Sequence, residues 1–284
     1  MIMISRLLFR LLCVALFLGY GSLHAETYVG GIIDHEQRWT PEESPYIVTR
    51  DILITGRGRL TIAPGTAVRV GKLVYYDDTI PQLDHLDSQL VAIRVEGVLR
   101  CIGRRQSRIS LSSAFELSNQ CVWYGVDIDE RYGRLTEIAF TDISGACNGV
   151  TVRRGETVVR NSVIELNNVG VRCVDRGNAR LYNCVVARNF TTGILVRESN
   201  PTILNSIVAF NKTNGLWCDG VSQVTFKNNC VFDNGDGDFL ECDPKLGALS
   251  ETSKNGDSTD TYGNIYMDPI LAGSPDSASH GATG

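Results

Sequence analysis

The chain has 284 residues and a formal net charge of −5 at neutral pH, from 27 basic and 32 acidic side chains. Hydrophobic residues make up 43% of it and charged residues 21%, so the composition is that of a folded globular protein and excludes an intrinsically disordered chain. The acidic balance also argues against nucleic acid as a partner, because proteins that bind it concentrate positive charge.

Residues 1–25 are typical of a secretory signal peptide. Arg6 precedes an apolar run over residues 7–18 that only Arg10 interrupts, and small or polar residues follow as far as Ala25. The run is too short to cross a hydrocarbon core of ~30 Å, so we expect no transmembrane segment after cleavage. Cleavage after Ala25 leaves 25 basic and 32 acidic side chains, a net charge of −7. We expect a secreted protein, extracellular or periplasmic.

Residues 26–58 are expected to form an N-terminal cap and opening strands, the strands at 46–48 and 52–54. Short alternating segments at 60–62, 68–70, 93–95 and 98–99 then indicate the first coils of a repetitive domain over residues 59–243. An acid-rich insertion between residues 71 and 91 is interpreted as a solvated loop, with a calcium site as the alternative. No other cofactor or metal is expected.

A repeat of about 22 residues dominates the rest of the chain. Six glycines recur at intervals of 21 to 24 residues and each opens an alternating apolar strand: Gly125, Gly149, Gly170, Gly193, Gly215 and Gly237. Counting from each glycine, positions +1 and +3 are predicted to point inward and positions +2 and +4 outward. A second strand of each repeat is expected at 163–164, 185–186, 207–208 and 230–231.

Two asparagine series share this period and keep a fixed offset of six residues. The first is Asn161, Asn183, Asn205 and Asn228, and the second is Asn167, Asn189, Asn211 and Asn234. We predict that both stack as structural ladders, with each amide donating to and accepting from its copy in the next coil.

The repeat predicts an all-β solenoid, a right-handed parallel β-helix. A leucine-rich repeat is the main alternative, but it requires leucines at paired spacings and a helical or 3₁₀ convex side. Valine and isoleucine dominate here instead, and no part of the repeat has a 3.6-residue period.

Eight cysteines remain after signal cleavage, which suggests disulfides in an exported protein. The register argues against pairing Cys173 with Cys218, because they lie two coils apart and stacked strands are spaced ~4.8 Å. Buried free thiols are the preferred interpretation. Cys230 with Cys242 is the pairing we expect first.

Residues 244–284 are expected to form an irregular tail. Residues 247–263 are rich in small and polar side chains, and residues 273–284 contain no aliphatic side chain larger than alanine. Such a tail cannot cover the last coil, so we expect either that the chain is truncated or that a partner covers this end.

The sequence resembles the secreted right-handed parallel β-helix repeat proteins, which share the fold of pectate lyases. The resemblance spans roughly residues 28–270 and depends on four segments besides the repeats: Leu60-Thr-Ile-Ala-Pro64-Gly65-Thr-Ala-Val68, Val95-Glu-Gly97-Val-Leu99, Trp123-Tyr-Gly125-Val126 and Asn264-Ile-Tyr-Met-Asp268-Pro269. In enzymes of this fold the outward face of the first strand commonly carries a polysaccharide groove. The resemblance therefore implies a polysaccharide or another cell-surface component as the partner.

The outward face contains the candidate binding residues. Arginine forks suit the carboxylates of an acidic sugar, and aromatic rings suit sugar faces. The ligand-binding candidates are Arg153, Arg172, Arg197, Trp217 and Phe239. A solvated face and packing under a neighbouring loop are the corresponding structural interpretations.

Catalytic candidates on this face are weak. A hydrolase needs two carboxylates that flank the glycosidic bond, and Asp219 with Glu241 or Asp127 with Asp129 have suitable spacing. A lyase needs a base, for which Arg197 beside Asp219 is the arrangement available. We therefore expect a non-catalytic β-helix that binds glycan or a surface partner, with a polysaccharide lyase or glycoside hydrolase as the alternative and a structural spacer of a larger surface protein as the third.

Overall fold

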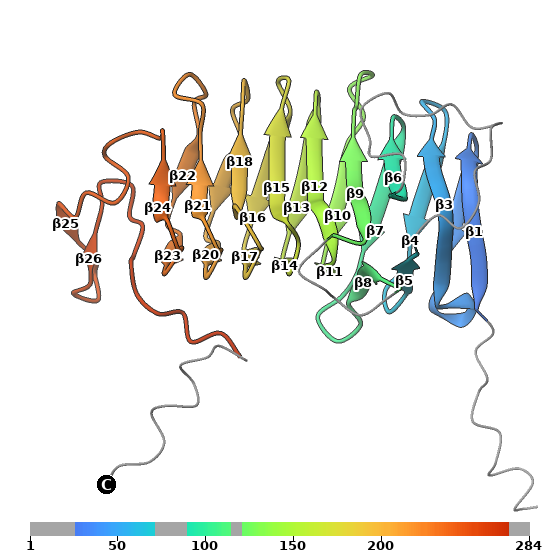
Figure 1. The fold of residues 1–284 in the computed structure, drawn as a ribbon, viewed down its shortest axis with the longest axis horizontal. Coiled ribbons are helices and arrows are strands. Elements are labelled where there is room, and N and C mark those ends of the chain that lie inside the picture. Colours follow the sequence, from blue (N-terminus) through green and yellow to red (C-terminus); the bar gives the residue numbers. More distant parts are fainter. Residues whose placement is uncertain (1–25, 72–89, 115–120, 273–284) are drawn as a thin grey trace, which may run out of the picture.

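The structure is a computed structural model that describes residues 26–71, 90–114 and 121–272, and the predicted signal peptide and acid-rich insertion lie outside these ranges. The chain winds as a parallel β-helix whose coils stack along the long axis, so the predicted all-β solenoid is confirmed (Figure 1). Within the described ranges the only helix is a short 3₁₀ turn, η1 (Pro41–Glu43). No helix there is long and apolar enough to span a membrane.

The strands that open with the repeating glycines form one side of the solenoid, which we call the first sheet. Its strands are β1 (Thr27–Ile33), the second half of β3 (Tyr46–Ile54), β6 (Ala92–Val95), β9 (Trp123–Ile128), β12 (Ala146–Arg153), β15 (Val169–Val174), β18 (Ile194–Val196), β21 (Asn214–Trp217) and β24 (Gly237–Leu240). β1 and β3 pair in parallel, so the segment expected as a cap already contributes regular strands.

Each coil contributes to two further sheets. The second sheet contains β2 (Glu36–Trp39), β4 (Arg59–Ile62), β7 (Val98–Ile102), β10 (Thr136–Ala139), β13 (Glu156–Arg160), β16 (Asn178–Tyr182), β19 (Thr202–Leu204) and β22 (Thr225–Lys227). The third contains the first half of β3 with β5 (Ala67–Val70), β8 (Ile109–Ser113), β11 (Thr141–Ile143), β14 (Val163–Glu165), β17 (Val185–Ala187), β20 (Ile207–Ala209) and β23 (Cys230–Phe232). The long strand β3 joins it to the first sheet, so that the two are hydrogen-bonded as one 16-stranded sheet. A small hairpin, β25 (Glu251–Thr252) and β26 (Ser258–Thr259), follows. Each repeat thus has three strands, and the sequence analysis identified two.

The inward positions of the first sheet form the core as predicted. From β9 to β21 their side chains are at most 3% exposed: Val126, Ile128, Val150, Val152, Val171, Cys173, Ile194, Val196, Leu216 and Cys218. A fully buried valine or isoleucine stabilises the fold by roughly 1.5–3 kcal/mol. Repetition of these apolar rows along the solenoid is therefore the main source of its stability.

The last coil departs from the predicted pattern at Phe239. Gly237 pairs with Asn214, so Phe239 pairs with Leu216 on the inward side and Leu240 pairs with Trp217 on the outward side. A shift of one residue reverses every side chain of a strand. The Phe239 ring packs edge-on against Phe226 at 5.8 Å between centroids. The assignment of Phe239 to the outward face is therefore wrong: it covers the end of the core.

The second asparagine series forms the predicted ladder. The four side chains are at most 6% exposed, and their amides donate from one coil to the next, Asn167 to Asn189 at 3.3 Å, Asn189 to Asn211 at 2.8 Å and Asn211 to Asn234 at 2.8 Å. Each side-chain oxygen also accepts a backbone N–H of the preceding coil, for example Ala146 N to Asn167 Oδ1 at 3.0 Å. The ladder satisfies polar groups at the turn between the third and first sheets.

The first asparagine series is different, and the expectation of a second buried amide ladder is wrong. Asn161, Asn183, Asn205 and Asn228 adopt φ values of 51–54° and are half-buried or exposed. Asparagine tolerates this left-handed conformation better than most residues, so these positions are turn residues. The buried stack is one residue later, where Cys184 N donates to Ser206 Oγ, Ser206 N to Asn229 Oδ1 and Asn229 Nδ2 to Asn264 Oδ1.

Part of the C-terminal segment adds to the solenoid instead of remaining an irregular tail. Ile265 N donates to the carbonyl of Asn229 and its carbonyl accepts from Val231 N, each at 2.9 Å. Asn264 continues the buried stack, and Asp260 accepts from its side chain. This segment therefore covers the third sheet at the end where the sequence analysis expected a truncation or a partner.

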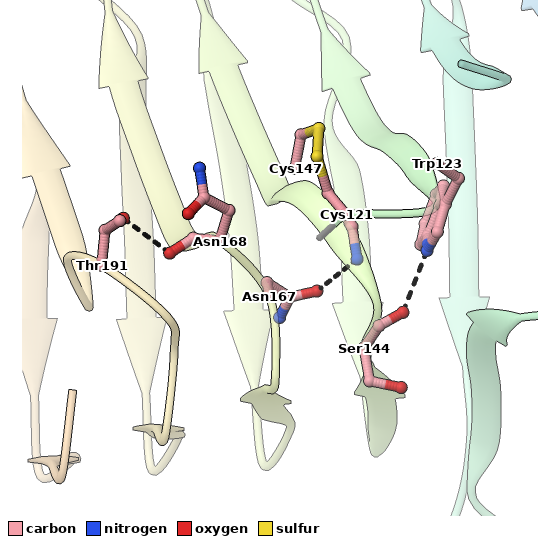
Figure 2. Close-up of a disulfide and its surroundings, with 8 residues drawn as sticks. Cys121, Trp123, Ser144, Cys147, Asn167, Asn168 and Thr191 are labelled. Atoms are coloured by element: carbon pink, nitrogen blue, oxygen red, sulfur yellow. Dashed lines mark hydrogen bonds between the residues drawn. A yellow bond between two sulfur atoms is a disulfide. The ribbon is translucent and has the colours of Figure 1, made fainter. Parts of the chain in front are cut away.

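The cysteines confirm some predictions and correct one. Cys121 and Cys147 form a disulfide between adjacent coils, with a Cα–Cα distance of 4.7 Å (Figure 2). The pairing of Cys230 with Cys242 is wrong, because Cys242 Sγ lies 2.7 Å from Cys218 Sγ. Cys101, Cys173 and Cys184 are buried free thiols as expected. Burial raises the pKa of Cys101 and Cys173 to about 12.

Candidate functional site

The outward face of the first sheet gathers most of the predicted site residues into two neighbouring columns. Successive strands align the residues of the first column in the order Leu53, Arg94, Asp127, Thr151, Arg172, Leu195, Trp217 and Leu240. The second column, two residues further along each strand, includes Asp129, Arg153, Val174 and Arg197. The two halves of this face differ in how their charges are paired.

The N-terminal half holds what we call the arginine–carboxylate cluster: Arg94, Asp127, Asp129, Arg131, Arg153 and Arg154. Asp127 accepts from Arg153 Nε at 2.8 Å. Asp129 accepts two hydrogen bonds of 2.7 Å from Arg154 and one of 2.8 Å from Arg131. Arg153, predicted to meet a ligand, is thus engaged by a carboxylate of the preceding coil.

The two carboxylates of the cluster are buried and electrostatically different. Burial raises the pKa of Asp127 although Arg153 opposes the shift. Burial also acts to raise the pKa of Asp129, but hydrogen bonds from Arg154 and Arg131 outweigh it and hold that pKa below its usual range. Asp127 is 2% exposed and Asp129 1%, so the arginines and neighbouring atoms separate both from solvent. In this conformation neither reaches a substrate.

The second predicted acid pair does not form an active site either. Asp219 accepts backbone N–H groups of Glu198 at 2.5 Å, Ser222 at 2.8 Å and Val221 at 3.1 Å. Burial acts to raise the pKa of Asp219, but these hydrogen bonds lower it to about 2. Glu241 is an exposed turn residue with φ of 55°, and its side chain makes no hydrogen bond or ion pair within the described ranges. Asp219 is therefore an ionised turn cap.

The C-terminal half of the face contains cations that no carboxylate of the described residues neutralises. We call Arg172, Leu195, Arg197 and Trp217 the arginine–tryptophan strip. The Arg197 guanidinium lies over the Trp217 ring, 5.4 Å from its centroid. Arg172 is half-buried beside Leu195 on the next strand and makes no ion pair among the residues that the structure describes. The strip therefore offers a half-buried indole and two guanidinium groups that form no ion pair within the described part of the chain.

A second basic surface, on the second sheet, was missed by the sequence analysis. Two adjoining pockets of about 420 and 430 Å³ share Arg59 and Arg100 among their lining residues. Arg38 and Arg104 line the first pocket and Arg57 lines the second. Arg59 and Arg100, which directly flank the segments predicted at 60–62 and 98–99 and alternate with their inward residues, are the signal that would have revealed this surface.

Comparison with known proteins bears on the fold. No curated protein matches the chain. Among solved structures, the A-module of a mannuronan C-5 epimerase of Azotobacter vinelandii is similar at 14% sequence identity, covering 78% of this chain and 71% of that one with a TM-score of 0.27. The sequence profile of the right handed beta helix region matches residues 114–255, half of the chain and nearly all of the regular repeat. The chain belongs to the right-handed β-helix family.

Proposed function

We propose that this β-helix binds an acidic polysaccharide along the arginine–tryptophan strip and does not cleave it. The observation that carries the proposal is the contrast between the two halves of the outward face. Arginines in the N-terminal half are neutralised by buried aspartates, whereas Arg172 and Arg197 have no carboxylate partner within the described ranges. Since residues 1–25 are predicted to be a signal peptide, we place the binding outside the cytoplasm.

The chemistry of the strip suits an acidic sugar chain. A guanidinium presents parallel N–H donors that match a carboxylate, and it remains charged at every physiological pH. The Trp217 ring restrains Arg197, so less side-chain freedom is lost when a ligand binds. Stacked strands are ~4.8 Å apart, which allows an extended chain to contact several coils at once.

The burial and the pKa shifts of the carboxylates on this face support a binding function more than a hydrolytic one. A glycoside hydrolase needs two carboxylates with access to opposite sides of the glycosidic bond. Asp127 and Asp129 lack that access at 2% and 1% exposure, and the low pKa of Asp219 makes it a poor general acid. A lyase would need Arg197 to lose a proton, and a guanidinium stays protonated in proteins.

An enzyme is the second candidate, and one observation favours it. Asp127 in β9 and Asp129 directly beyond its end have pKa values shifted in opposite directions, a pattern typical of paired acid and base groups. A lyase or glycoside hydrolase would use this pair only if the covering arginines moved away. The third candidate, a structural spacer of a larger surface protein, predicts neither binding nor cleavage.

Calorimetric titration with polygalacturonate, and with neutral dextran as a control, tests the proposal. Each charge-assisted hydrogen bond contributes about 1.5–3 kcal/mol, so Arg172→Ala and Arg197→Ala should each weaken polygalacturonate binding about tenfold or more. Arg100→Ala on the second sheet is the matched control and should leave the affinity unchanged. Unchanged affinity in both strip variants, or an equal loss in Arg100→Ala, would place the binding elsewhere and overturn the proposal.

A further inference from the structure

Two cysteines meet at the C-terminal end of the first sheet. Cys218 directly follows β21 and Cys242 lies just beyond β24, on the adjacent coil. Their Sγ atoms are 2.7 Å apart, in direct contact. Cys218 is 3% exposed and Cys242 is half-buried, so a reagent reaches Cys242 first.

The coil register explains why these two cysteines meet. They are 24 residues apart, about one coil of the solenoid, and Glu241, directly before Cys242, is in the left-handed conformation with φ of 55°. The existing disulfide between Cys121 and Cys147 joins neighbouring coils in the same way, across a separation of 26 residues. A contact between adjacent coils thus satisfies the spacing that a disulfide requires.

We propose that Cys218 and Cys242 are a dithiol site that forms a second disulfide, joining the last two coils of the first sheet. The oxidant is an external disulfide, either a small-molecule disulfide or the disulfide of a thiol oxidoreductase. This inference is independent of the proposed glycan binding.

The exchange proceeds in two balanced steps. The Cys242 thiolate attacks one sulfur of the external disulfide, forming a mixed disulfide and releasing one thiol of the donor. Cys218 then gives up its proton and attacks Cys242 Sγ, which releases the second donor thiol. In total the protein loses two protons and two electrons, and the external disulfide gains both and becomes two thiols.

The surroundings of the two sulfurs assign these roles. The hydrogen bond that the two thiols share lowers the pKa of Cys242. The same hydrogen bond, together with burial, raises the pKa of Cys218. Cys242, more exposed and more readily ionised, is the attacking sulfur, and Cys218 is the resolving one.

The bond would fix the final strand of the first sheet. β24 is the last strand of that sheet, and its Phe239 covers the end of the core. Holding Cys242 on Cys218 keeps β24 paired with β21, so that Leu240 stays level with Trp217.

Alkylation of the purified full-length protein followed by peptide mass spectrometry tests this inference. After incubation with oxidised glutathione, we expect Cys218 and Cys242 to resist iodoacetamide and their peptides to appear linked, lighter by two hydrogens. Dithiothreitol should make both reactive. Cys230→Ser is the control, because Cys230 contacts the Met267 carbonyl instead and its loss should leave the link intact.

Two results would overturn the inference, and neither depends on a destabilised variant. One is complete alkylation of Cys218 and Cys242 in a sample whose Cys121–Cys147 disulfide has formed. The other is a cross-link of Cys242 to Cys230 in the wild-type protein.

Discussion

Replacing Asn189 by alanine is the sharpest test of how the solenoid is held together. Its side-chain nitrogen donates to Asn211 Oδ1 at 2.8 Å and to the Ile164 carbonyl at 3.3 Å. Its oxygen accepts the backbone N–H of Asn167 at 3.1 Å. Alanine removes the two donated bonds and leaves a buried backbone N–H of the preceding coil without a partner.

The expected loss of stability follows from these contacts. Two net hydrogen bonds contribute about 0.5–1.5 kcal/mol each, and an unsatisfied buried donor costs about 1–3 kcal/mol. The sum for Asn189→Ala is about 2–6 kcal/mol. Urea unfolding followed by circular dichroism measures it, and a lower midpoint with an unchanged slope would mean that stability alone has changed.

Asn183 provides the matched control because it has the same period but is exposed, with φ of 54°. Alanine at this position loses asparagine's tolerance of the left-handed region and should cost about 1 kcal/mol. Asn183→Gly should be nearly neutral, since glycine adopts that conformation freely. If Asn183→Ala costs as much as Asn189→Ala, the distinction between turn and ladder series fails.

Two further predictions concern the corrected residues. Phe239→Ala should lower the free energy of unfolding by about 2–3 kcal/mol, less than the loss expected for a fully buried phenylalanine. The affinity for polygalacturonate should not change. Weakened binding with unchanged stability would show that the ring lies on the outward face. Asp219→Asn should destabilise the protein at pH 7. Because the folded pKa of Asp219 is depressed to about 2, the stabilisation that its ionised form adds is complete above its unfolded pKa of about 3.9 and is lost as pH falls toward 2. The gap between the unfolding midpoints of wild type and variant should therefore narrow over that interval, and a constant gap would contradict the assigned role.

The sequence predicted the solenoid well because the repeat determines both the period and the inward positions. It did not separate the two asparagine series. Asparagine is favoured both in left-handed turns and in stacked amides, so Asn161 and Asn167 have the same period for different physical reasons. Whether an asparagine forms a turn or a buried ladder depends on which side of the backbone faces the core at its position.

The site was less predictable than the fold, because the pairing of its charged side chains depends on contacts between adjacent coils. Asp127, Asp129 and Arg153 were correctly placed on the outward face, but Arg153 was expected to be available to a ligand. Its partner Asp127 lies 26 residues away along the chain and in the adjacent coil. Aligning the coils residue by residue would have shown acids facing arginines here and would have left Arg172 unpaired.

Phe239 shows the limit of counting from the glycines. The count places it level with Trp217, whereas Gly237 pairs with Asn214 instead of Gly215. The last coil must cover apolar side chains that no further coil covers, and the inward aromatic ring meets that need. The end of a solenoid therefore departs from its repeat for a physical reason that the repeat does not contain.

The most direct test follows binding and chain length in one sample of wild-type protein with polygalacturonate. Calorimetry reports saturable binding, and size-exclusion chromatography of the same mixture after prolonged incubation reports the length of the polysaccharide. Binding by the strip without catalysis predicts saturable heat and an unchanged elution profile. Shortened chains, or no saturable binding, would contradict it.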